Sequence, residues 1–220
     1  MINNRMKIVI FDTETTGLPK SLEPADKSPN NWPHLVSISW VVLENTLPHA
    51  ISKQRSYIIK PQNWTIPEDS IKIHKITNEI AMKEGLSLKD VMEEFIAENP
   101  THLIAHHMEF DLNVLIHAIK WDLGLDIYKK LHGCNLFCTM HISRPYCLLP
   151  TKYKNIYKSP KLQELYEFIF KRSPNTKKLH GSLYDTTILV ECIQHAQWLQ
   201  KELGLNKSSL YTINELHQEE

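Results

Sequence analysis

Residues 8–17, with the sequence IVIFDTETTG, combine an apolar run with two acids that are separated by one residue. The apolar run predicts a buried β-strand, and side chains alternate along a strand, so Asp12 and Glu14 share one face. Two carboxylates at the end of a buried strand are destabilising unless a cation compensates them. A divalent metal ion bound to a phosphate substrate would do so, and the stretch therefore predicts a metal-dependent phosphate enzyme.

Two further acids border the apolar stripes of predicted helices. Asp111 precedes apolar residues by three, four and eight positions, and Asp185 precedes them by three, four and seven. A single inward-facing aspartate is commonly a helix cap or part of a buried ion pair. Two such acids on separate segments, together with the pair in the strand, instead predict one shared carboxylate cluster.

Three motifs resemble those of the DEDDh branch of the 3′→5′ exonucleases, a family that includes the proofreading subunit of bacterial replicative DNA polymerase. They are FDTETTG at residues 11–17, AHHMEFD at 105–111 and HGSLYD at 180–185, in the family's order. The resemblance spans about residues 6–196. Weaker marks at residues 66–67, 73–77 and 138–139 agree with it.

The resemblance implies an α/β fold of the ribonuclease H-like type, with a mixed five-stranded sheet flanked by helices. It also implies which residues are catalytic. The acids that would act in catalysis and hold metal are Asp12, Glu14, Asp111 and Asp185, and His180 would be the general base.

Four positions beside the motifs are candidate substrate contacts. By analogy, Thr15 and Leu18 would touch the terminal nucleotide. His106 and Phe110 are further candidates, and packing in the interior is the alternative for each of them. Family members usually carry Asn where this chain has His107, which leaves the role of that position open.

The chemistry of phosphodiester cleavage explains this set of residues. In-line displacement needs stabilisation of the attacking and leaving oxygens, which two divalent ions about 4 Å apart supply. Carboxylate oxygens suit Mg²⁺ or Mn²⁺ better than zinc. His180 lies five residues before Asp185, roughly 140° away around a helix, so it is expected on the loop entering that helix. There its imidazole could take a proton from the attacking water.

The order of predicted elements indicates an antiparallel meander followed by alternating helices and strands. Strands are expected near residues 6–12, 35–43, 54–60 and 102–106, and helices around 91–96, 112–119, 162–169 and 183–199. The exonuclease domain is expected to span residues 1–200. Within it, residues 18–34 are rich in proline and asparagine and read as an insertion loop near the active site. A polar tail is expected at residues 201–220.

Composition sets further bounds. The chain has 220 residues, a formal net charge of zero and 42% hydrophobic residues, which is ordinary for one globular domain. No apolar run approaches a membrane span and no signal-peptide pattern is seen, so a cytoplasmic protein is expected. Glycine is too scarce for a nucleotide-binding glycine loop. A zinc site at Cys134, Cys138, Cys147 and His141 is the weaker alternative to reduced thiols, because no Cys-x-x-Cys pair is present.

We therefore expect a metal-dependent 3′→5′ exonuclease that releases nucleoside monophosphates from single-stranded ends, with DNA favoured. An RNA-trimming exoribonuclease or oligoribonuclease is the alternative within the same fold. A haloacid dehalogenase-like phosphatase normally has Asp where this chain has Glu14, and a non-catalytic nucleic-acid-binding module would tend to lose motif acids that are all present. The chain is too short to include a polymerase, so proofreading would require a polymerase partner in trans. Monomer and homodimer both stay open.

Overall fold

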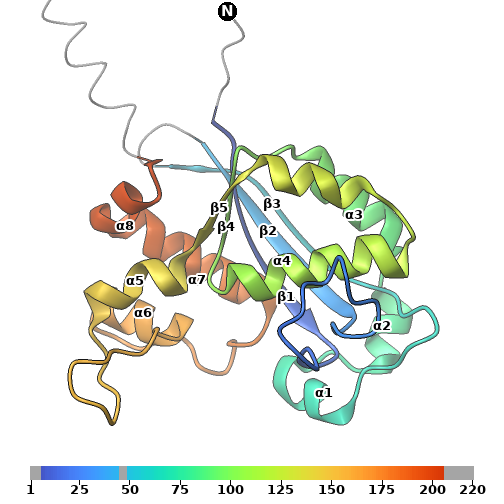
Figure 1. Ribbon diagram of the computed structural model, residues 1–220, viewed down its shortest axis with the longest axis horizontal. Coiled ribbons are helices and arrows are strands. Elements are labelled where there is room, and N and C mark those ends of the chain that lie inside the picture. The colour runs from blue at the N-terminus through green and yellow to red at the C-terminus, as the bar shows by residue number, and fades with distance from the viewer. Residues whose placement is uncertain (1–5, 45–48, 206–220) are drawn as a thin grey trace, which may run out of the picture.

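The computed structural model describes residues 6–44 and 49–205, which form a mixed five-stranded sheet with helices on both faces (Figure 1). The strand order is β3-β2-β1-β4-β5. An antiparallel meander of β1, β2 and β3 is extended by β4 and β5, which run parallel to β1. The strand bounds are β1 Ile8–Thr15, β2 Leu35–Leu43, β3 Ile51–Ile58, β4 His102–Ala105 and β5 Asn135–Cys138. The predicted fold class is confirmed.

The helices follow the predicted apolar patterns, with one exception. The expected helix over 183–199 is divided at Ala196, whose backbone is extended. The side-chain amide of Gln200 donates to the carbonyls of Ile193 and Gln194, which satisfies the end of the first part. The helices are α1 Glu68–His74, α2 Asn78–Glu84, α3 Leu88–Ala97, α4 Met108–His117, α5 Thr139–Cys147, α6 Leu162–Phe170, α7 Ser182–His195 and α8 Gln197–Glu202. A π-helical turn, η1 Ala118–Asp122, continues α4, and η2 Ile127–Gly133 is a 3₁₀ helix.

Strand β1 is buried on both faces, and each face belongs to a different hydrophobic cluster. Val9 and Phe11 pack with α3 and α4, whereas Ile8 and Ile10 pack with α6, α7 and α8. The same alternation continues past Phe11. Asp12 and Glu14 therefore lie on the α7 side of the sheet, and Thr13 lies on the α4 side.

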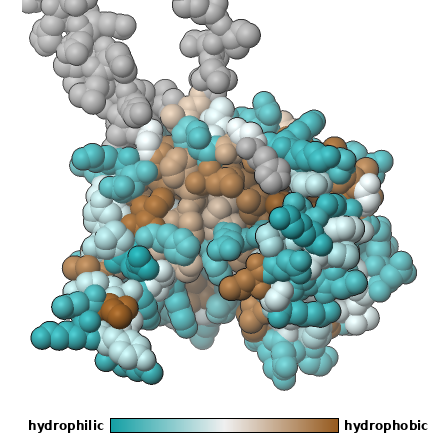
Figure 2. Space-filling model, in the orientation of Figure 1, coloured by the Kyte–Doolittle hydropathy of each residue, from teal (hydrophilic) through white to brown (hydrophobic). Residues whose placement is uncertain are grey.

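The surface around this core is mostly hydrophilic in the view of Figure 2, with hydrophobic residues gathered near the middle of that face. The edge strand β5 contributes to exposed apolar area, since Leu136 is 42% exposed. Within the described part of the chain, no helix is long and apolar enough to span a membrane.

The predicted insertion, residues 18–34, is a loop that packs on α4. Ala25 and Trp32 are buried in the same cluster as α3 and α4. The backbone of Ala25 is bonded on both sides: its N–H donates to Asn113 Oδ1 at 2.8 Å, and its carbonyl accepts from Trp121 Nε1 at 2.6 Å. The loop therefore has a defined place beside α4.

The carboxyl-terminal end of the described chain differs from the predicted boundary. Helix α8 runs through residue 201, and Leu203 and Leu205 are buried against the α7 side of the core. The packed part thus extends to residue 205, and residues 206–220 of the predicted tail lie outside the described residues.

Gly85 occupies a point where two backbones approach closely. The chain pairs there with the segment after β3, through Lys60 N to Leu86 O and Leu86 N to Ile58 O, both 2.9 Å. A Cβ at position 85 would lie 2.6 Å from Lys60 N and also too close to Ala81 O. Both are backbone atoms in hydrogen-bonded segments, so only glycine fits without displacement.

We expect Gly85→Ala to lower the free energy of unfolding by about 1–3 kcal/mol, as overpacking against backbone typically does. Urea denaturation followed by circular dichroism would measure the change. Gly133→Ala is the matched control, because a Cβ there meets no described heavy atom within 4 Å, and its effect should stay within about 0.5 kcal/mol. Equal stability of the two variants would contradict this account of Gly85.

Candidate active site

The first two acids lie near the carboxyl end of β1. Asp12 is paired in register with Ser39 of β2, and Glu14 with Ser37. The hydroxyls of both serines are bonded to Ser182 Oγ, at 2.8 and 3.1 Å respectively. Since Ser182 is the first residue of α7, this hydroxyl network fixes the amino terminus of α7 beside the acid pair.

Asp111 approaches the pair from the other side of the sheet. It lies in the first turn of α4 and is 4% exposed. Its Oδ1 accepts hydrogen bonds from Thr13 N at 3.2 Å and from Thr13 Oγ1 at 2.6 Å. Thr13 therefore ties α4 to β1 and sets the position of this carboxylate.

Asp185 lies in the first turn of α7. Its Oδ2 accepts from the backbone N–H of His180 at 3.1 Å. Its Oδ1 is buried and has no hydrogen-bond partner among the described residues. One carboxylate oxygen is thus left free to bind a group that the protein itself does not supply.

His180 lies in the segment that enters α7, as its spacing from Asp185 predicts. Its φ of 61° is in the left-handed region, and Gly181 follows it as the N-cap of α7. The side chain is exposed, while the backbone N–H is held by Asp185. The imidazole can therefore move over the carboxylates from a fixed anchor, and its role as a base stays a prediction.

The acids form a close group without a cationic partner. Ligand oxygens of Asp12, Glu14 and Asp185 lie within 4.8 Å of one another. Within residues 6–44 and 49–205, these three acids and Asp111 make no ion pair. The amino termini of α4 and α7 supply partial positive charge, since Asp111 and Asp185 lie in their first turns.

Burial dominates the titration of this group. Loss of hydration raises the pKa of Glu14 to about 9, and the charges of Asp185 and Asp111 add to the rise. Burial also raises the pKa of Asp12 well above its usual range. The pKa of Asp111 rises to about 7 and that of Asp185 to about 6, although hydrogen bonds from Thr13 and His180 oppose the rise. Without a cation, the cluster thus holds protons at neutral pH.

This donor set fits hard divalent cations. All the ligand atoms are carboxylate oxygens, which Mg²⁺ and Mn²⁺ prefer, and Oδ1 of Asp185 is a buried oxygen without a hydrogen-bond partner among the described residues. A bound cation would reverse the cost of burying the ionised acids. The geometry therefore supports a site for divalent metal at Asp12, Glu14, Asp111 and Asp185.

The structure places His106 in the interior, and its contact with substrate stays a prediction. The ring is buried, with Nδ1 3.0 Å from Thr139 Oγ1 and Nε2 3.0 Å from the carbonyl oxygen of Pro160. Burial lowers the pKa of His106 to about 4, which keeps the ring neutral. His106 is thus an interior link between β4, α5 and α6. The exposed neighbour is His107, the N-cap of α4, which stacks on Phe110.

The remaining predicted contacts have different surroundings. Thr15 Oγ1 donates to the carbonyl of Gly17 at 2.7 Å, which shapes the turn after β1. Leu18 is 81% exposed beside that turn and is free to meet a ligand. Phe110 is half-buried and packs against Trp32 of the 18–34 loop, 5.9 Å between ring centroids. Their roles toward substrate stay predictions.

Sequence reasoning gave no site role to His74, although the structure places it against the backbone of Thr15, the residue after Glu14. It is buried at the end of α1, and burial lowers its pKa against an opposing contact with the Thr15 backbone. With Ser182 and Tyr184 it lines a cavity of about 510 Å³, and none of the four acids is part of that lining. The available signal was its position in residues 73–77, one of the weaker family marks.

The cysteines do not form a metal centre in the described structure. Cys134, Cys138, Cys147 and Cys192 are all free thiols. None of them belongs to a group of ligand atoms close enough to hold a metal ion. The zinc alternative at Cys134, Cys138, Cys147 and His141 is therefore not supported.

Comparison with known proteins gives a matching family and a relative. The model of the RNase_T family, described as exonuclease, matches residues 9–193. DNA polymerase III subunit epsilon of Buchnera aphidicola subsp. Schizaphis graminum is 28% identical over 189 residues, which is 86% of this chain and 73% of that protein.

Solved structures of exonuclease I share the fold. The zinc-bound complex of Escherichia coli exonuclease I with single-stranded DNA superimposes with a TM-score of 0.66 at 15% identity over 95% of this chain. Exonuclease I from Methylocaldum szegediense gives a TM-score of 0.67 at 15% identity over 90% of it. The chain spans only 43% and 42% of those two proteins, so the likeness concerns their shared fold.

The bond between Thr13 and Asp111 generates a test of how the cluster is positioned. Thr13→Val keeps the side-chain shape but removes the hydroxyl donor to Asp111, and should weaken Mn²⁺ binding about 10–100-fold, as loss of a ligand's supporting hydrogen bond does. Isothermal titration calorimetry would measure the affinity. Thr13→Ser retains the hydroxyl and should bind nearly as wild type. Equal Mn²⁺ affinities of the valine and serine variants would show that the Thr13 hydroxyl does not position Asp111 for metal binding.

Burial of Glu14 predicts how stability depends on pH without metal. Its pKa is about 9 in the folded chain against an ordinary 4.5 when unfolded, so the folded state keeps a proton that the unfolded state releases between these values. The free energy of unfolding should therefore fall as pH rises from about 4.5 to about 9.

Glu14→Gln mimics the protonated acid and should remove part of this decline. In chelator at pH 8 we expect a gain of about 1 kcal/mol or more, which corresponds to about 2–4 °C in Tm. Near pH 4.5 the variant and the wild type should have the same Tm. The exposed Glu79→Gln on α2 is the control and should not change the pH dependence. A Glu14→Gln variant that is less stable than wild type at pH 8 would contradict the predicted burial cost.

Proposed function

The chain belongs to the exonuclease family, and from this membership we propose that it hydrolyses phosphodiester bonds at the 3′ end of single-stranded nucleic acid. The products are nucleoside monophosphates, and DNA is the favoured substrate. One observation carries the proposal. The acids Asp12, Glu14, Asp111 and Asp185 converge from three elements into one group, with Asp111 buried and the others half-buried, and without a cationic partner among the described residues.

The same four carboxylates would hold two Mg²⁺ or Mn²⁺ ions. Such ions, when bound, stabilise the attacking and leaving oxygens of the phosphodiester. The chain's own contribution is to fix the carboxylates. Thr13 holds Asp111, and the His180 backbone holds Asp185, so each acid stays in place whether or not substrate is present.

His180 is the proposed general base. Its imidazole Nε2 or Nδ1 would accept a proton from the water that attacks the terminal phosphodiester. The exposed side chain is free to reach this water, whereas the buried His106 has both ring nitrogens engaged. His180 thus meets the needs of proton transfer better than His106 does.

The terminal nucleotide would occupy the cavity lined by His74, Ser182 and Tyr184, the residue that precedes Asp185. Leu18, exposed after the first motif, is proposed to contact it together with the Thr15 turn. DNA is favoured because exonuclease I is solved with DNA oligonucleotides and the matched relative is a DNA polymerase subunit. By the same relative, a polymerase is the proposed partner in trans.

Cleavage of end-labelled strands tests the proposal. Single-stranded DNA and RNA of one sequence, labelled at the 5′ end, are incubated with Mg²⁺, Mn²⁺ or chelator. We expect a metal-dependent ladder that shortens from the 3′ end, faster on DNA. Asp12→Ala and Asp185→Ala should fold but lose cleavage, and His180→Ala should lower kcat by about 10²–10⁴-fold.

His195→Ala is the matched control for the base, because this exposed histidine lies at the far end of α7 from Asp185. It should cleave as wild type. Faster shortening of RNA would select the exoribonuclease alternative. Binding of single strands without cleavage under any metal would overturn the enzymatic proposal.

A further inference from the structure

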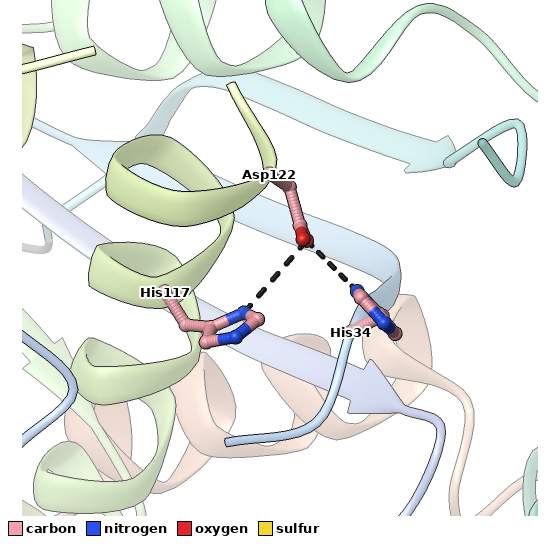
Figure 3. A group of neighbouring side chains, drawn as sticks. All are labelled: His34, His117 and Asp122. Carbon is pink, nitrogen blue, oxygen red and sulfur yellow. Dashed lines mark hydrogen bonds and ion pairs between the residues drawn. The ribbon is translucent and has the colours of Figure 1, made fainter. Parts of the chain in front are cut away.

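A second group of metal-type ligands shares no residue with the carboxylate cluster (Figure 3). It consists of His34, which directly precedes β2, His117, the last residue of α4, and Asp122, the last residue of η1. One ligand atom from each lies within 4.8 Å of the others. Figure 3 shows the Asp122 carboxylate between the two imidazole rings.

The hydrogen bonding of His117 leaves a nitrogen lone pair directed into this group. Its Nε2 lies 2.9 Å from the carbonyl oxygen of Pro29. A carbonyl only accepts, so Nε2 carries the hydrogen, and in the neutral ring Nδ1 carries the lone pair.

This lone pair has no partner in the described structure. His117 is 3% exposed, and its Nδ1 makes no hydrogen bond with a described residue. The nearest charged atom, Asp122 Oδ2, is 3.7 Å away and is itself an acceptor. A buried nitrogen lone pair that faces a carboxylate oxygen at this distance is an arrangement in which one cation could bind both atoms.

The third ligand has a fixed orientation. The ring of His34 stacks on Trp64, with 5.1 Å between centroids and 4° between planes, and its Nδ1 lies 3.0 Å from Asp122 Oδ2. The two nitrogen-to-oxygen distances, 3.0 and 3.7 Å, bracket the spacing of about 3.3 Å between ligands in a tetrahedral zinc site with bonds near 2.05 Å. His34 and Asp122 are 34% and 18% exposed, so water can reach a fourth position.

We propose that His34, His117 and Asp122 form a binding site for a zinc-class divalent ion, with water as the fourth ligand. Two imidazoles and one carboxylate suit Zn²⁺ better than Mg²⁺. The carbonyl of Pro29 orients His117 through the other ring nitrogen, as outer groups do for metal-bound histidines. The π-helical turn that carries Asp122 is a form common at functional sites.

The bound ion would link the 18–34 loop, through His34, to the end of α4, through His117. Two hydrogen bonds of 3.0 Å join His34 and Thr16. The backbone N–H of His34 donates to Thr16 Oγ1, and the backbone N–H of Thr16 donates to the carbonyl of His34. Thr16 follows Glu14 by two residues. A cavity of about 500 Å³ adjoins the proposed metal site and is lined by Gly17, Leu18 and the two histidines. The ion thus stabilises the loop beside the first motif and takes no part in bond cleavage.

Zinc binding to the tag-free protein tests this site independently of nuclease activity. The protein used carries the double substitution Asp12→Asn and Asp185→Asn, which removes two ligands of the carboxylate cluster and so limits zinc binding there. We expect one Zn²⁺ per chain by calorimetry, and a Tm that rises with Zn²⁺ because the ion binds only the folded state. Co²⁺ as a probe should give the visible absorption of a tetrahedral site with nitrogen ligands.

Single substitutions in this background decide the assignment. His117→Gln and Asp122→Asn should each weaken Zn²⁺ binding more than about 10-fold and remove the rise in Tm, whereas His195→Gln should change neither. Asp122→Asn keeps the size of a partly exposed side chain, so it serves where His117→Gln fails to fold. Zinc affinity in Asp122→Asn equal to that in His195→Gln would overturn the proposal. These measurements do not depend on nuclease activity, so a failure of the proposed exonuclease function would not change the result for zinc binding.

Discussion

Desolvation of four clustered carboxylates without a basic partner is the constraint on which the arrangement around β1 depends, with Asp111 buried and the other three half-buried. Desolvation raises the pKa of Asp12, Glu14, Asp111 and Asp185, so the ionised cluster is unfavourable in the described structure alone. Partial compensation comes from the amino termini of α4 and α7 and from donors such as the Thr13 hydroxyl. Under the proposed function, a divalent ion would supply the remaining compensation, and these residues would bind metal before they act on substrate.

The two-sided core explains how one strand brings these elements together. Alternate residues of β1 bury in separate clusters, one under α3 and α4 and one under α6 to α8. At the carboxyl end of the strand the same alternation directs Thr13 toward α4 and the acid pair toward α7. The site therefore lies where both clusters end, and packing on either side of the sheet holds one of the two helical acids.

Local spacing predicts much of this arrangement, because strand and helix periods determine which residues share a face. The inward placement of Asp111 and Asp185, and of His180 ahead of α7, follows from spacing alone. The division of the last helix does not, since it depends on Gln200 folding back onto Ile193. His106 and His107 are adjacent, and only the tertiary contacts with Thr139 and Pro160 reveal which is interior.

The most direct test of the account is anomalous diffraction from crystals of the wild-type protein soaked in Mn²⁺. The account predicts manganese peaks enclosed by Asp12, Glu14, Asp111 and Asp185, with the orphaned Oδ1 of Asp185 among the ligands. Crystals with manganese bound elsewhere and none among these four carboxylates would contradict the claim that their burial is compensated by divalent metal.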